Sequence, residues 1–255
     1  MCGRYTLVRG EKILEVVGNV TIREDLRRFM EKGRFNIAPT QDVLVVLRQG
    51  ASVPELTLMR WGLIPHWAKD ASIASKLINA RAETLAEKPS FRQALLKRRC
   101  VIPADGFYEW RKNADGSKTP MYATLKTGEG FAFAGLYETW HAPTGEEVTT
   151  CTIITTGPNE LMAPIHTRMP AILLREGVQA WLDGAPRSAE ELQGMLVPLE
   201  AEKMQLRAVG KEVNRAGAEG ASLIEPVTDV PVAVVEKAQA KRGRKEKNTG
   251  QGSLF

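Results

Sequence analysis

The residue with the most distinctive chemistry stands directly after the initiator methionine. Methionine aminopeptidases remove Met1 when the next side chain is small, and cysteine qualifies, so Cys2 would carry both a free α-amine and a thiol. Their reference pKa values, about 7.7–8.0 and about 8.5, leave a useful fraction of nucleophile near neutral pH. Such a 1,2-aminothiol condenses with an aldehyde through an imine, and the thiol then closes a five-membered thiazolidine ring. Because this second bond forms within one molecule, the ring outlasts a simple imine.

Three further segments carry side chains suited to proton transfer or anion binding. They contribute Asn79 with Arg81, Glu109 with aromatic neighbours on both sides, and His166 with Arg168. Aromatic neighbours desolvate a carboxylate, so we expect a raised pKa for Glu109. Taken singly, each feature has an ordinary structural explanation: an amide that caps a turn, a carboxylate on a solvent face, a structural histidine, or a cysteine in an incidental arm. The functional interpretation therefore depends on the whole set.

The composition is that of an ordinary globular protein. The chain has 255 residues, of which 43% are hydrophobic and 25% charged, enough to bury one core. No run approaches the ~20 apolar residues of a membrane helix, and the N-terminus lacks a signal-peptide core, so we expect a cytoplasmic protein without membrane contact. Cys100 and Cys151 lie in apolar runs and are expected to be inert core thiols. The three histidines show no ligand spacing, so neither a metal nor another cofactor is expected.

The positive charge is concentrated near the C-terminus. The formal net charge of the whole chain is +5, and residues 237–247 alone carry +5. The remainder is near neutral, so a phosphate-binding surface on the folded part must be a local patch. After Val235 the composition is too polar for a packed core, which predicts a disordered basic tail over residues 236–255.

Hydrophobic periodicity predicts an α+β fold made of many short elements. Helical spacing is found at 11–17, 22–32, 89–99, 158–164, 176–182 and 188–196. Strand patterns are found at 43–47, 56–61, 100–102, 121–126, 131–140, 148–156 and 206–213. Residues 62–80 are expected to form a loop, and Asp115-Gly116 has hairpin-turn chemistry. We therefore expect a single domain over residues 1–235, with a curved, mainly antiparallel, barrel-like sheet flanked by short helices.

The chemically distinctive segments together resemble one family, the SOS-response-associated peptidase (SRAP) family of abasic-site processing proteins, which includes the HMCES-type proteins. The matching segments are MCGRY, RFNIAPTQ, RWGLIPHW, INARAET, RRCVIPADGFYEW, TTGPN, IHTRMP and LIEPV. They extend from residue 1 to about 170, with the last at 223–227, and their order and wide spacings agree. The resemblance is therefore specific, and it carries no function over to residues 112–119 or to the tail.

The resemblance implies that Cys2 forms a thiazolidine with the aldehyde of an abasic site in single-stranded DNA and so shields the lesion. Asn79 matches an asparagine that hydrogen-bonds near the reacting centre. Glu109 and His166 match two acid–base residues, since opening the sugar and expelling water both need proton transfer. His166 is also expected to help reverse the adduct. An imine at the sugar can undergo β-elimination, so weak lyase activity is expected as a side reaction.

DNA contacts are expected around this centre. The expected residues are Arg4, Trp67, Arg81, Thr155 and Arg168. The three arginines lie beside the reacting residues and suit bidentate phosphate contacts. Trp67 could stack on a base or belong to the core, whereas Trp61 is expected in the core. Thr155 matches a backbone-contacting position. The target is expected to be single-stranded, because a short arm cannot reach a sugar inside a stacked duplex, and the bound protein would be found at the nucleoid.

The last five residues form a separate motif. Gln251, Leu254 and Phe255 resemble the short peptide with which bacterial replication and repair proteins bind the sliding clamp, although Gly252 stands where leucine is usual. A five-residue motif also arises by chance, so the clamp is an open interpretation. The basic segment before it could add salt-sensitive DNA affinity. Nothing in the sequence demands more than a monomer.

Two other functions remain open. The first is a cysteine peptidase with Cys2 as an N-terminal nucleophile, which could act on its own Met1–Cys2 bond. The second is a non-catalytic module that binds modified DNA, with Cys2 as a spectator. Covalent capture predicts a heat-stable adduct that needs both the abasic site and Cys2, whereas the binding module predicts no adduct.

Overall fold

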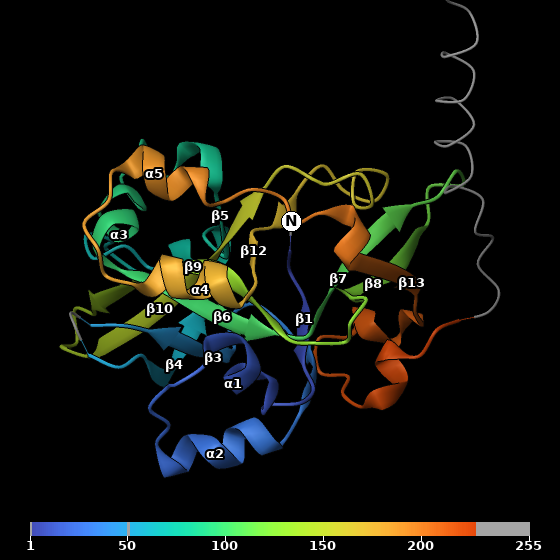
Figure 1. The fold of residues 1–255 in the computed structure, drawn as a ribbon, viewed down its shortest axis with the longest axis horizontal. Coiled ribbons are helices and arrows are strands. Elements are labelled where there is room, and N and C mark those ends of the chain that lie inside the picture. Colours follow the sequence, from blue (N-terminus) through green and yellow to red (C-terminus); the bar gives the residue numbers. More distant parts are fainter. Residues whose placement is uncertain (1, 50–51, 228–255) are drawn as a thin grey trace, which may run out of the picture.

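A closed five-stranded β-barrel is the larger of the two sheet systems of the protein (Figure 1). The structure is a computed structural model, and it describes residues 2–49 and 52–227. The barrel strands are β3 (Asp42–Leu47), β4 (Glu55–Trp61), β6 (Arg99–Ala104), β9 (Phe131–His141) and β10 (Glu147–Thr156). They pair in the order β3–β4–β10–β9–β6, and β6 pairs with β3 again, which closes the barrel. All of these pairs are antiparallel except β4–β10.

A second sheet of five strands lies beside the barrel, in the order β13–β8–β7–β1–β2. Its strands are β1 (Tyr5–Leu7), β2 (Arg34–Ile37), β7 (Gly106–Lys112), β8 (Lys118–Leu125) and β13 (Met204–Ala208). All four pairings are antiparallel. The β7–β8 hairpin turns at the expected Asp115-Gly116, where Gly116 adopts a φ of +83° that favours glycine. Only Asp105 separates β6 from β7, so the chain passes directly from the barrel into this sheet.

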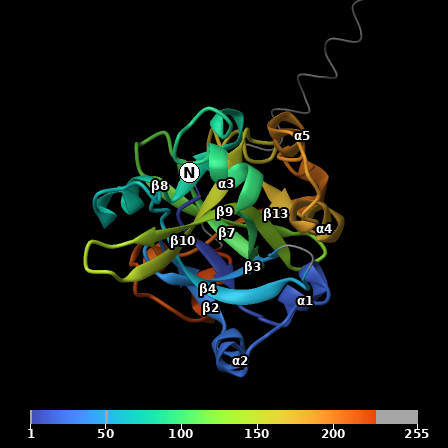
Figure 2. The same ribbon diagram turned by 90° about the vertical axis from the view of Figure 1, so that its left-hand side faces the viewer.

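Short elements cover the rims of the barrel (Figures 1 and 2). β5 (Asn79–Arg81) pairs in parallel with β10, β11 (Met169–Pro170) pairs with the same strand, and β12 (Ile172–Leu173) pairs with β9. The helices are α1 (Lys12–Val17), α2 (Glu24–Glu31), α3 (Arg92–Lys97), α4 (Arg175–Leu182) and α5 (Ala189–Gly194). Helices α1 and α2 lie at one end of the molecule, and α3 and α5 lie at the other. Among the described residues, no helix is long and apolar enough to cross a membrane.

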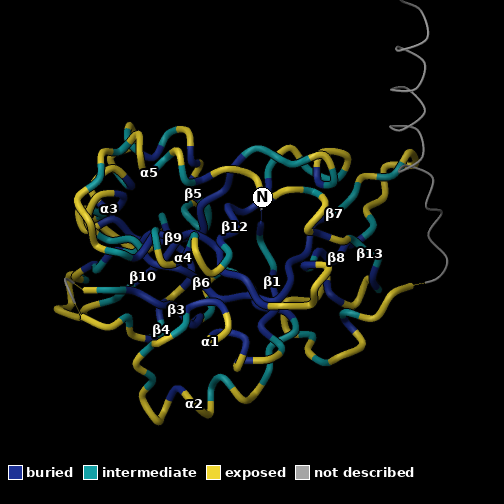
Figure 3. Tube along the Cα trace, in the orientation of Figure 1, coloured by how far each residue is buried: buried dark blue, intermediate teal, exposed yellow. Residues whose placement is uncertain are grey.

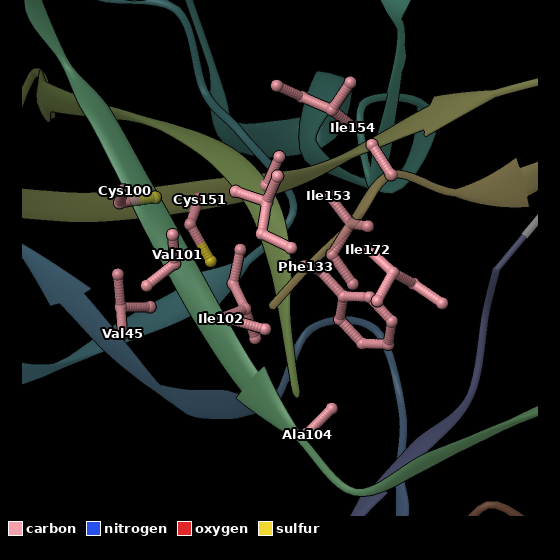
Figure 4. Packing of buried hydrophobic residues seen from close by; sticks show 14 of the residues in the cluster. Val45, Cys100, Val101, Ile102, Ala104, Phe133, Cys151, Ile153, Ile154 and Ile172 are labelled. Atoms are coloured by element: carbon pink, nitrogen blue, oxygen red, sulfur yellow. The ribbon is translucent and has the colours of Figure 1, made fainter. Parts of the chain in front are cut away.

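The barrel interior is the centre of a large apolar core (Figures 3 and 4). Strands β9 and β10 are buried along most of their length, because the barrel interior is filled on one side and covering elements shield the other. Ile102, Phe133 and Ile153 contribute to the packing, and Cys100 and Cys151 are fully buried, as expected for core thiols. Burial raises the pKa of both thiols, so both are protonated near neutral pH.

Strand β1 is anchored by the buried carboxylate of Asp105. One of its oxygens accepts a hydrogen bond from Thr6 Oγ1 (2.6 Å), and the other accepts from the backbone N–H groups of Val8 and Arg9 (2.7 and 3.2 Å). Thr6 Oγ1 also lies 2.8 Å from the hydroxyl of Tyr122. These bonds satisfy a carboxylate that would otherwise be costly to bury, and they fix the register of a strand of only three residues. The N-terminal arm before β1 is thereby held between the two sheets.

The predicted α+β fold class is confirmed, but the helix expected at residues 158–164 is wrong. Turns are found at residues 160–165 instead. Pro164 supplies no backbone N–H, so a helix cannot continue through it. The side chain of Asn159 also accepts a hydrogen bond from Met162 N (2.8 Å), which stabilises a local turn.

Three other segments differ from the sequence pattern. The strand expected at 206–213 ends at Ala208, and a 3₁₀ turn, η4 (Lys211–Asn214), follows Gly210. Strand β5 lies largely in the segment that was expected to form a loop, and no strand was expected where β2 lies. Both strands form because each pairs with a strand distant in sequence. The predicted tail at 236–255 lies outside the described residues, so the domain boundary stays a prediction.

Candidate active site

The N-terminal arm lies where the barrel and the second sheet meet (Figure 1). The carbonyl of Arg4 accepts a hydrogen bond from Tyr108 N of β7 (3.0 Å). The carbonyl of Cys2 accepts one from Asn79 Nδ2 of β5 (2.9 Å). Because β7 belongs to the second sheet and β5 extends the barrel sheet, the arm is held from both sides. Its first residues therefore meet side chains from segments far apart in the sequence.

Cys2 is fully buried in the core cluster. Burial, with a smaller contribution from the charge of Glu109, raises the pKa of its thiol well above the ordinary value. The thiol is therefore protonated near neutral pH. An α-amine exposed on the same residue would be the group more readily available as a nucleophile, because its reference pKa is only about 7.7–8.0.

Asn79 is the first residue of β5, and its backbone is in register with Ile153 of β10. Its Nδ2 donates to the Cys2 carbonyl, while its Oδ1 is buried and has no hydrogen-bond partner among the described residues. An unpaired buried polar atom costs about 1–3 kcal/mol unless a bound group satisfies it. A ligand hydroxyl or amine would satisfy this oxygen, which indicates a binding position beside Cys2.

Glu109 lies on β7, opposite Met121 of β8, and is only 3% exposed. Desolvation raises its pKa from 4.5 to about 7, and the positive charge of the chain's amino terminus acts in the opposite direction. The raised pKa agrees with the expectation from its aromatic neighbours. Near neutral pH the carboxyl group is present in both protonation states, which suits a residue that must both give and take a proton.

His166 comes directly after the turns at 160–165 and is half-buried. Its Nδ1 accepts a hydrogen bond from the backbone N–H of Arg168 (3.0 Å), and the Arg168 carbonyl lies 3.2 Å from the same nitrogen. The Arg168 N–H can donate to Nδ1 only when the ring proton is on Nε2, whereas the Arg168 carbonyl can accept from Nδ1 only when the proton is there. Desolvation lowers the pKa of His166, and the charges of the amino terminus and of Arg168 act in the same direction, while the backbone hydrogen bond to Arg168 acts in the opposite direction. The imidazole is therefore neutral near pH 7, and Arg168 contacts it through Nδ1.

Arg81 and Arg168 have different surroundings. Arg81, at the end of β5, is exposed, and its backbone is in register with Thr155 of β10. The guanidinium of Arg168 forms a bidentate ion pair with Glu83 (2.6 and 2.9 Å) and also donates to the carbonyl and hydroxyl of Thr155. Thr155 is buried, so its side chain belongs to this internal network. Arg81 is thus the more accessible of the two cations.

Arg4 and the two tryptophans lie in three different settings. The guanidinium of Arg4 donates to Asn36 Oδ1 (2.7 Å) and to the carbonyl of Val213 (2.6 Å), so it ties the arm to β2 and to the segment after β13. Trp67 is 51% exposed on the loop between β4 and β5, where it is accessible to a nucleic-acid base. Trp61 is fully buried, as expected for a core residue.

Two charged residues of this region were not predicted from the sequence. Asp105 anchors β1, and its position inside an apolar run, VIPADGFY, was a usable signal because a carboxylate there must find partners. Glu83 pairs with Arg168, which is 85 positions away. No local pattern identifies a partner at that separation, so this pair could be recognised only in the folded chain.

Four separate segments contribute Cys2, Asn79, Glu109 and His166 to this region. They offer a cysteine next to the amino terminus, a buried acceptor, a carboxyl group that titrates near neutrality and a neutral imidazole. Such a set suits the condensation of an amine with a carbonyl compound, because protons must move onto and off the same oxygen. Within residues 2–49 and 52–227, no group of three or more His, Cys, Asp and Glu side chains could hold a metal ion.

The fold and the site define a class of proteins in which a five-stranded barrel and a second sheet enclose a cysteine that follows the initiator methionine. Over residues 1–216, the sequence matches the family described as SOS response associated peptidase (SRAP). This protein belongs to the SRAP family.

Its relatives are named abasic site processing proteins. The chain is 45% identical over 225 residues to the abasic site processing protein YoqW of Bacillus subtilis, covering 88% of this chain and 99% of the relative. It is 31% identical over 280 residues to the abasic site processing protein HMCES of Gallus gallus, covering 94% and 82% respectively. A solved structure of a protein from Bacteroides thetaiotaomicron matches with a TM-score of 0.78 and 27% identity, covering 89% of this chain and 100% of that one.

Proposed function

We propose that this protein captures the aldehyde of an abasic site in single-stranded DNA as a covalent thiazolidine on Cys2, after Met1 has been removed. The observation that carries the proposal is the hydrogen bond from Asn79 to the Cys2 carbonyl, which holds the N-terminal arm beside polar residues of the barrel. The charge of Glu109 acts on the same cysteine from the second sheet. The names of the relatives, abasic site processing proteins, support an abasic site as the substrate.

The α-amine of Cys2 attacks first in this proposal, because the buried thiol is held protonated. The amine adds to the aldehyde carbon C1′, and the carbinolamine loses water to give an imine. The thiol sulfur then bonds to the same carbon, the C=N bond becomes a single bond, and the thiol proton ends on the ring nitrogen. The net reaction joins the aldehyde to the aminothiol and releases one water molecule.

Glu109 carries the proton transfers, and His166 assists them. An abasic sugar is mostly a closed ring, so its C1′ hydroxyl must lose a proton while its ring oxygen gains one. Glu109 in its ionised form takes the first proton and returns it to the ring oxygen as the C1′–O4′ bond breaks, while the Nε2–H of His166 donates a hydrogen bond to that oxygen. The proton that the attacking amine loses then protonates Glu109 again. Protonated Glu109 then assists the departure of water from the carbinolamine. The buried Oδ1 of Asn79 accepts a hydrogen bond from a sugar hydroxyl.

The DNA strand is bound through phosphates and bases on either side of the abasic sugar. Arg81 is exposed two residues from Asn79, so it is the principal phosphate ligand in this proposal. Trp67 stacks on a neighbouring base. Arg4, Thr155 and Arg168 contribute less, since internal hydrogen bonds occupy their polar groups. A single strand fits because a buried N-terminal residue cannot reach a sugar within a stacked duplex.

The imine stage allows a slower lyase reaction. Before the thiol closes the ring, the iminium acidifies the C2′ proton, and loss of that proton expels the 3′ phosphate by β-elimination. The strand is then cleaved on the 3′ side of the lesion. Ring closure removes the iminium, so capture and strand cleavage compete for one intermediate.

The C-terminal peptide is proposed to bind the sliding clamp through Gln251, Leu254 and Phe255, which lie outside the described residues. Its support is the sequence motif at the end of a basic segment. Calorimetry with the purified clamp tests it: the full chain should bind, and a chain that lacks residues 251–255 should not. Equal affinities, or no binding by the full chain, would remove this part of the proposal.

A crosslinking gel tests the covalent function. Protein with Met1 removed, verified by mass spectrometry, is mixed with single-stranded DNA that carries one abasic site, and intact DNA serves as the control. The mixtures are denatured by heat and detergent. We expect a shifted band that requires both the abasic site and Cys2, and that is absent for Cys2→Ala.

The absence of a shifted band from fully processed protein would refute covalent capture. Equal binding of abasic and intact strands without an adduct would then favour a binding module. Loss of Met1 in cells without aminopeptidase activity, measured by mass spectrometry, would favour a self-processing peptidase.

A further inference from the structure

Glu83 is a charged residue of the NARAET segment for which the proposed chemistry has no role. Its carboxylate contacts both terminal nitrogens of Arg168, at 2.6 and 2.9 Å. The Glu83 side chain is 54% exposed, whereas that of Arg168 is 16% exposed. A carboxylate that engages a guanidinium through two parallel hydrogen bonds fixes its orientation as well as its position. The Arg168 contact also lowers the pKa of Glu83, so the Glu83 carboxyl group is ionised near neutral pH.

Arg168 links Glu83 to the strands around it. Besides Glu83, its Nη2 donates to the carbonyl and hydroxyl of Thr155 on β10. Thr155 lies between β5 and β11, since its backbone is in register with Arg81 on one side and Pro170 on the other. The Arg168 side chain therefore joins the 3₁₀ turn after β5, which contains Glu83, to the end of β10.

The backbone of Arg168 in turn contacts the ring of His166. Its N–H lies 3.0 Å from His166 Nδ1, a contact in which the ring proton is on Nε2. A backbone N–H can hold an imidazole in one orientation only if that backbone is itself fixed. On the N-terminal side, the backbone N–H of His166 donates to the carbonyl of Met162 (3.0 Å) and anchors the main chain of His166 itself. The backbone that contacts the ring lies on the C-terminal side, where Arg168 and β11 anchor it.

We propose that Glu83 is a positioning residue of the candidate site: through Arg168 it holds His166 in the orientation that presents Nε2–H to the sugar. This inference rests on the proposed role of His166 as a hydrogen-bond donor to the sugar. Without the Glu83 carboxylate, only the Thr155 contacts would hold the Arg168 guanidinium. The backbone N–H of Arg168 would then be held less firmly against the imidazole, and we expect the proportions of the two His166 tautomers to change.

The same geometry restricts Arg168 as a phosphate ligand. A bidentate phosphate contact needs two parallel N–H donors on one edge of the guanidinium. Glu83 occupies the Nη1–Nη2 edge, Nη2 also serves Thr155, and Nε is buried. A phosphate could bind in this manner only by displacing Glu83. Competition between Glu83 and a phosphate is therefore the alternative that an experiment must separate from positioning.

The first test measures the rate of adduct formation against the concentration of abasic single-stranded DNA. Glu83→Gln removes the charge and keeps the shape, and Glu87→Gln is a matched control because Glu87 is an exposed carboxylate of the same segment. For Glu83→Gln we expect the maximal rate to fall about tenfold, with the half-saturating DNA concentration unchanged within about twofold. Glu87→Gln should match the wild type. Arg168→Lys should lose a similar factor, and adding Glu83→Gln to it should cost little more.

The second test reads His166 directly and does not depend on adduct formation. Nitrogen NMR of ¹⁵N-histidine-labelled protein, with His166→Gln for assignment, should show one Nε2–H tautomer in the wild type and in Glu87→Gln. Glu83→Gln should give ¹⁵N chemical shifts of His166 that are averaged over the two tautomers. Glu83→Asp keeps the charge on a shorter side chain, so its shifts should lie between those of the wild type and those of Glu83→Gln. Thermal melting of each variant separates this effect from global unfolding.

Two outcomes would overturn the inference. A Glu83→Gln protein with the wild-type maximal rate and unchanged His166 signals would show that the ion pair does not position the imidazole. The other outcome is a Glu83→Gln protein that captures at the full rate and binds intact single-stranded DNA more tightly. If the slope of log K against log salt is also steeper by about 0.7, Glu83 competes with a phosphate. If the wild type forms no adduct, the proposed function fails, while the NMR comparison still decides the link between Glu83 and His166.

Discussion

Burial sets the protonation states at the candidate site. Desolvation raises the pKa of the Cys2 thiol and of Glu109 and lowers that of His166, so in each case it favours the uncharged form. The cost of placing charge in an apolar environment explains all three directions. In the proposed capture, a thiol that stays protonated does not compete with the amine for the aldehyde. A carboxyl group with a pKa of about 7 can exchange protons with that amine at little cost.

Glu109→Gln should slow adduct formation about 100-fold, within the usual range for the loss of one acid–base group. In the wild type we expect a bell-shaped pH dependence. Protonated Glu109 is lost above about pH 7, and the neutral amine is lost below its reference pKa of about 7.7–8.0. The maximum should therefore lie between about pH 7 and 8. In Glu109→Gln the fall on the alkaline side should disappear. Rates measured from pH 5.5 to 9.5 decide this, and an unchanged profile would exclude Glu109 as the acid.

Glu109 should also make the protein less stable as the pH rises. Its folded pKa is about 7 and its ordinary value is 4.5, so between these values the folded state binds more protons than the unfolded state. Stability therefore falls as the pH rises through this window, by about 3 kcal/mol at most. Glu109→Gln should lose this dependence and melt at a higher temperature than the wild type at pH 8. Calorimetry at pH 5 and pH 8 measures it, with Glu87→Gln as the control. Parallel pH dependences in wild type and Glu109→Gln would contradict the raised pKa.

At the scale of elements, the three-residue strand β1 determines where Cys2 lies. It pairs with β2 and β7, and Asp105, Thr6 and Tyr122 fix its register. The close approach of Tyr122 is possible only because residue 106 is glycine. A Cβ at Gly106 would lie 2.2 Å from the Tyr122 hydroxyl. The position of the arm therefore depends on the contact between Thr6 and Tyr122, although Thr6 lies four residues along the chain from Cys2.

Gly106→Ala should displace the Tyr122 ring and break its contact with Thr6. We expect a loss of about 1–3 kcal/mol in the free energy of unfolding, as for other overpacked sites. Capture should slow as well, because β1 would shift relative to β7. Gly194→Ala, at the end of α5, is the control, since a Cβ there meets nothing within 4 Å and should be neutral or slightly stabilising. Equal unfolding free energies for the two variants in urea would contradict this account.

At the scale of the whole molecule, the site exists only where two sheets meet. Asn79 belongs to a strand paired with the barrel, Glu109 to the second sheet, and Cys2 to the arm between them. A change that separates the sheets would disperse the site even if each sheet stayed intact. The folded part is near neutral, and the net charge of +5 resides in residues 237–247. Catalysis and non-specific DNA affinity are therefore expected to reside in different parts of the chain.

Removal of residues 236–255 should leave the melting temperature and the maximal rate of capture unchanged. The affinity for single-stranded DNA should fall, and the slope of log K against log salt should become shallower by up to roughly 3, since each neutralised phosphate contributes about 0.7. Replacing the basic residues of 237–247 with glutamine in the full-length chain should have the same effect, which separates charge from length. A lower melting temperature after truncation would place part of the folded domain beyond residue 235.

Some features of this protein are determined by its sequence alone, because their physical origin is local. Side-chain chemistry is local, so Cys2, Asn79, Glu109 and His166 can be named as candidates from residue type and motif. Periodicity is also local, so the α+β class and most long strands can be predicted. Pro164 was an equally local indication against the helix expected at 158–164, because proline has no backbone N–H to donate.

Other features were decided only by the tertiary structure. The parallel pairing of β4 with β10 closes the barrel, and Arg4 uses its donors on Asn36 and Val213, which lie 32 and 209 positions away. Glu83 finds Arg168 across 85 positions. Partners at such separations are brought together by the folding of the whole core, and no pattern within one segment encodes them. The sequence therefore named the candidate reacting groups, while the fold decided which charges remain available to a ligand and which are used to hold the candidate site together.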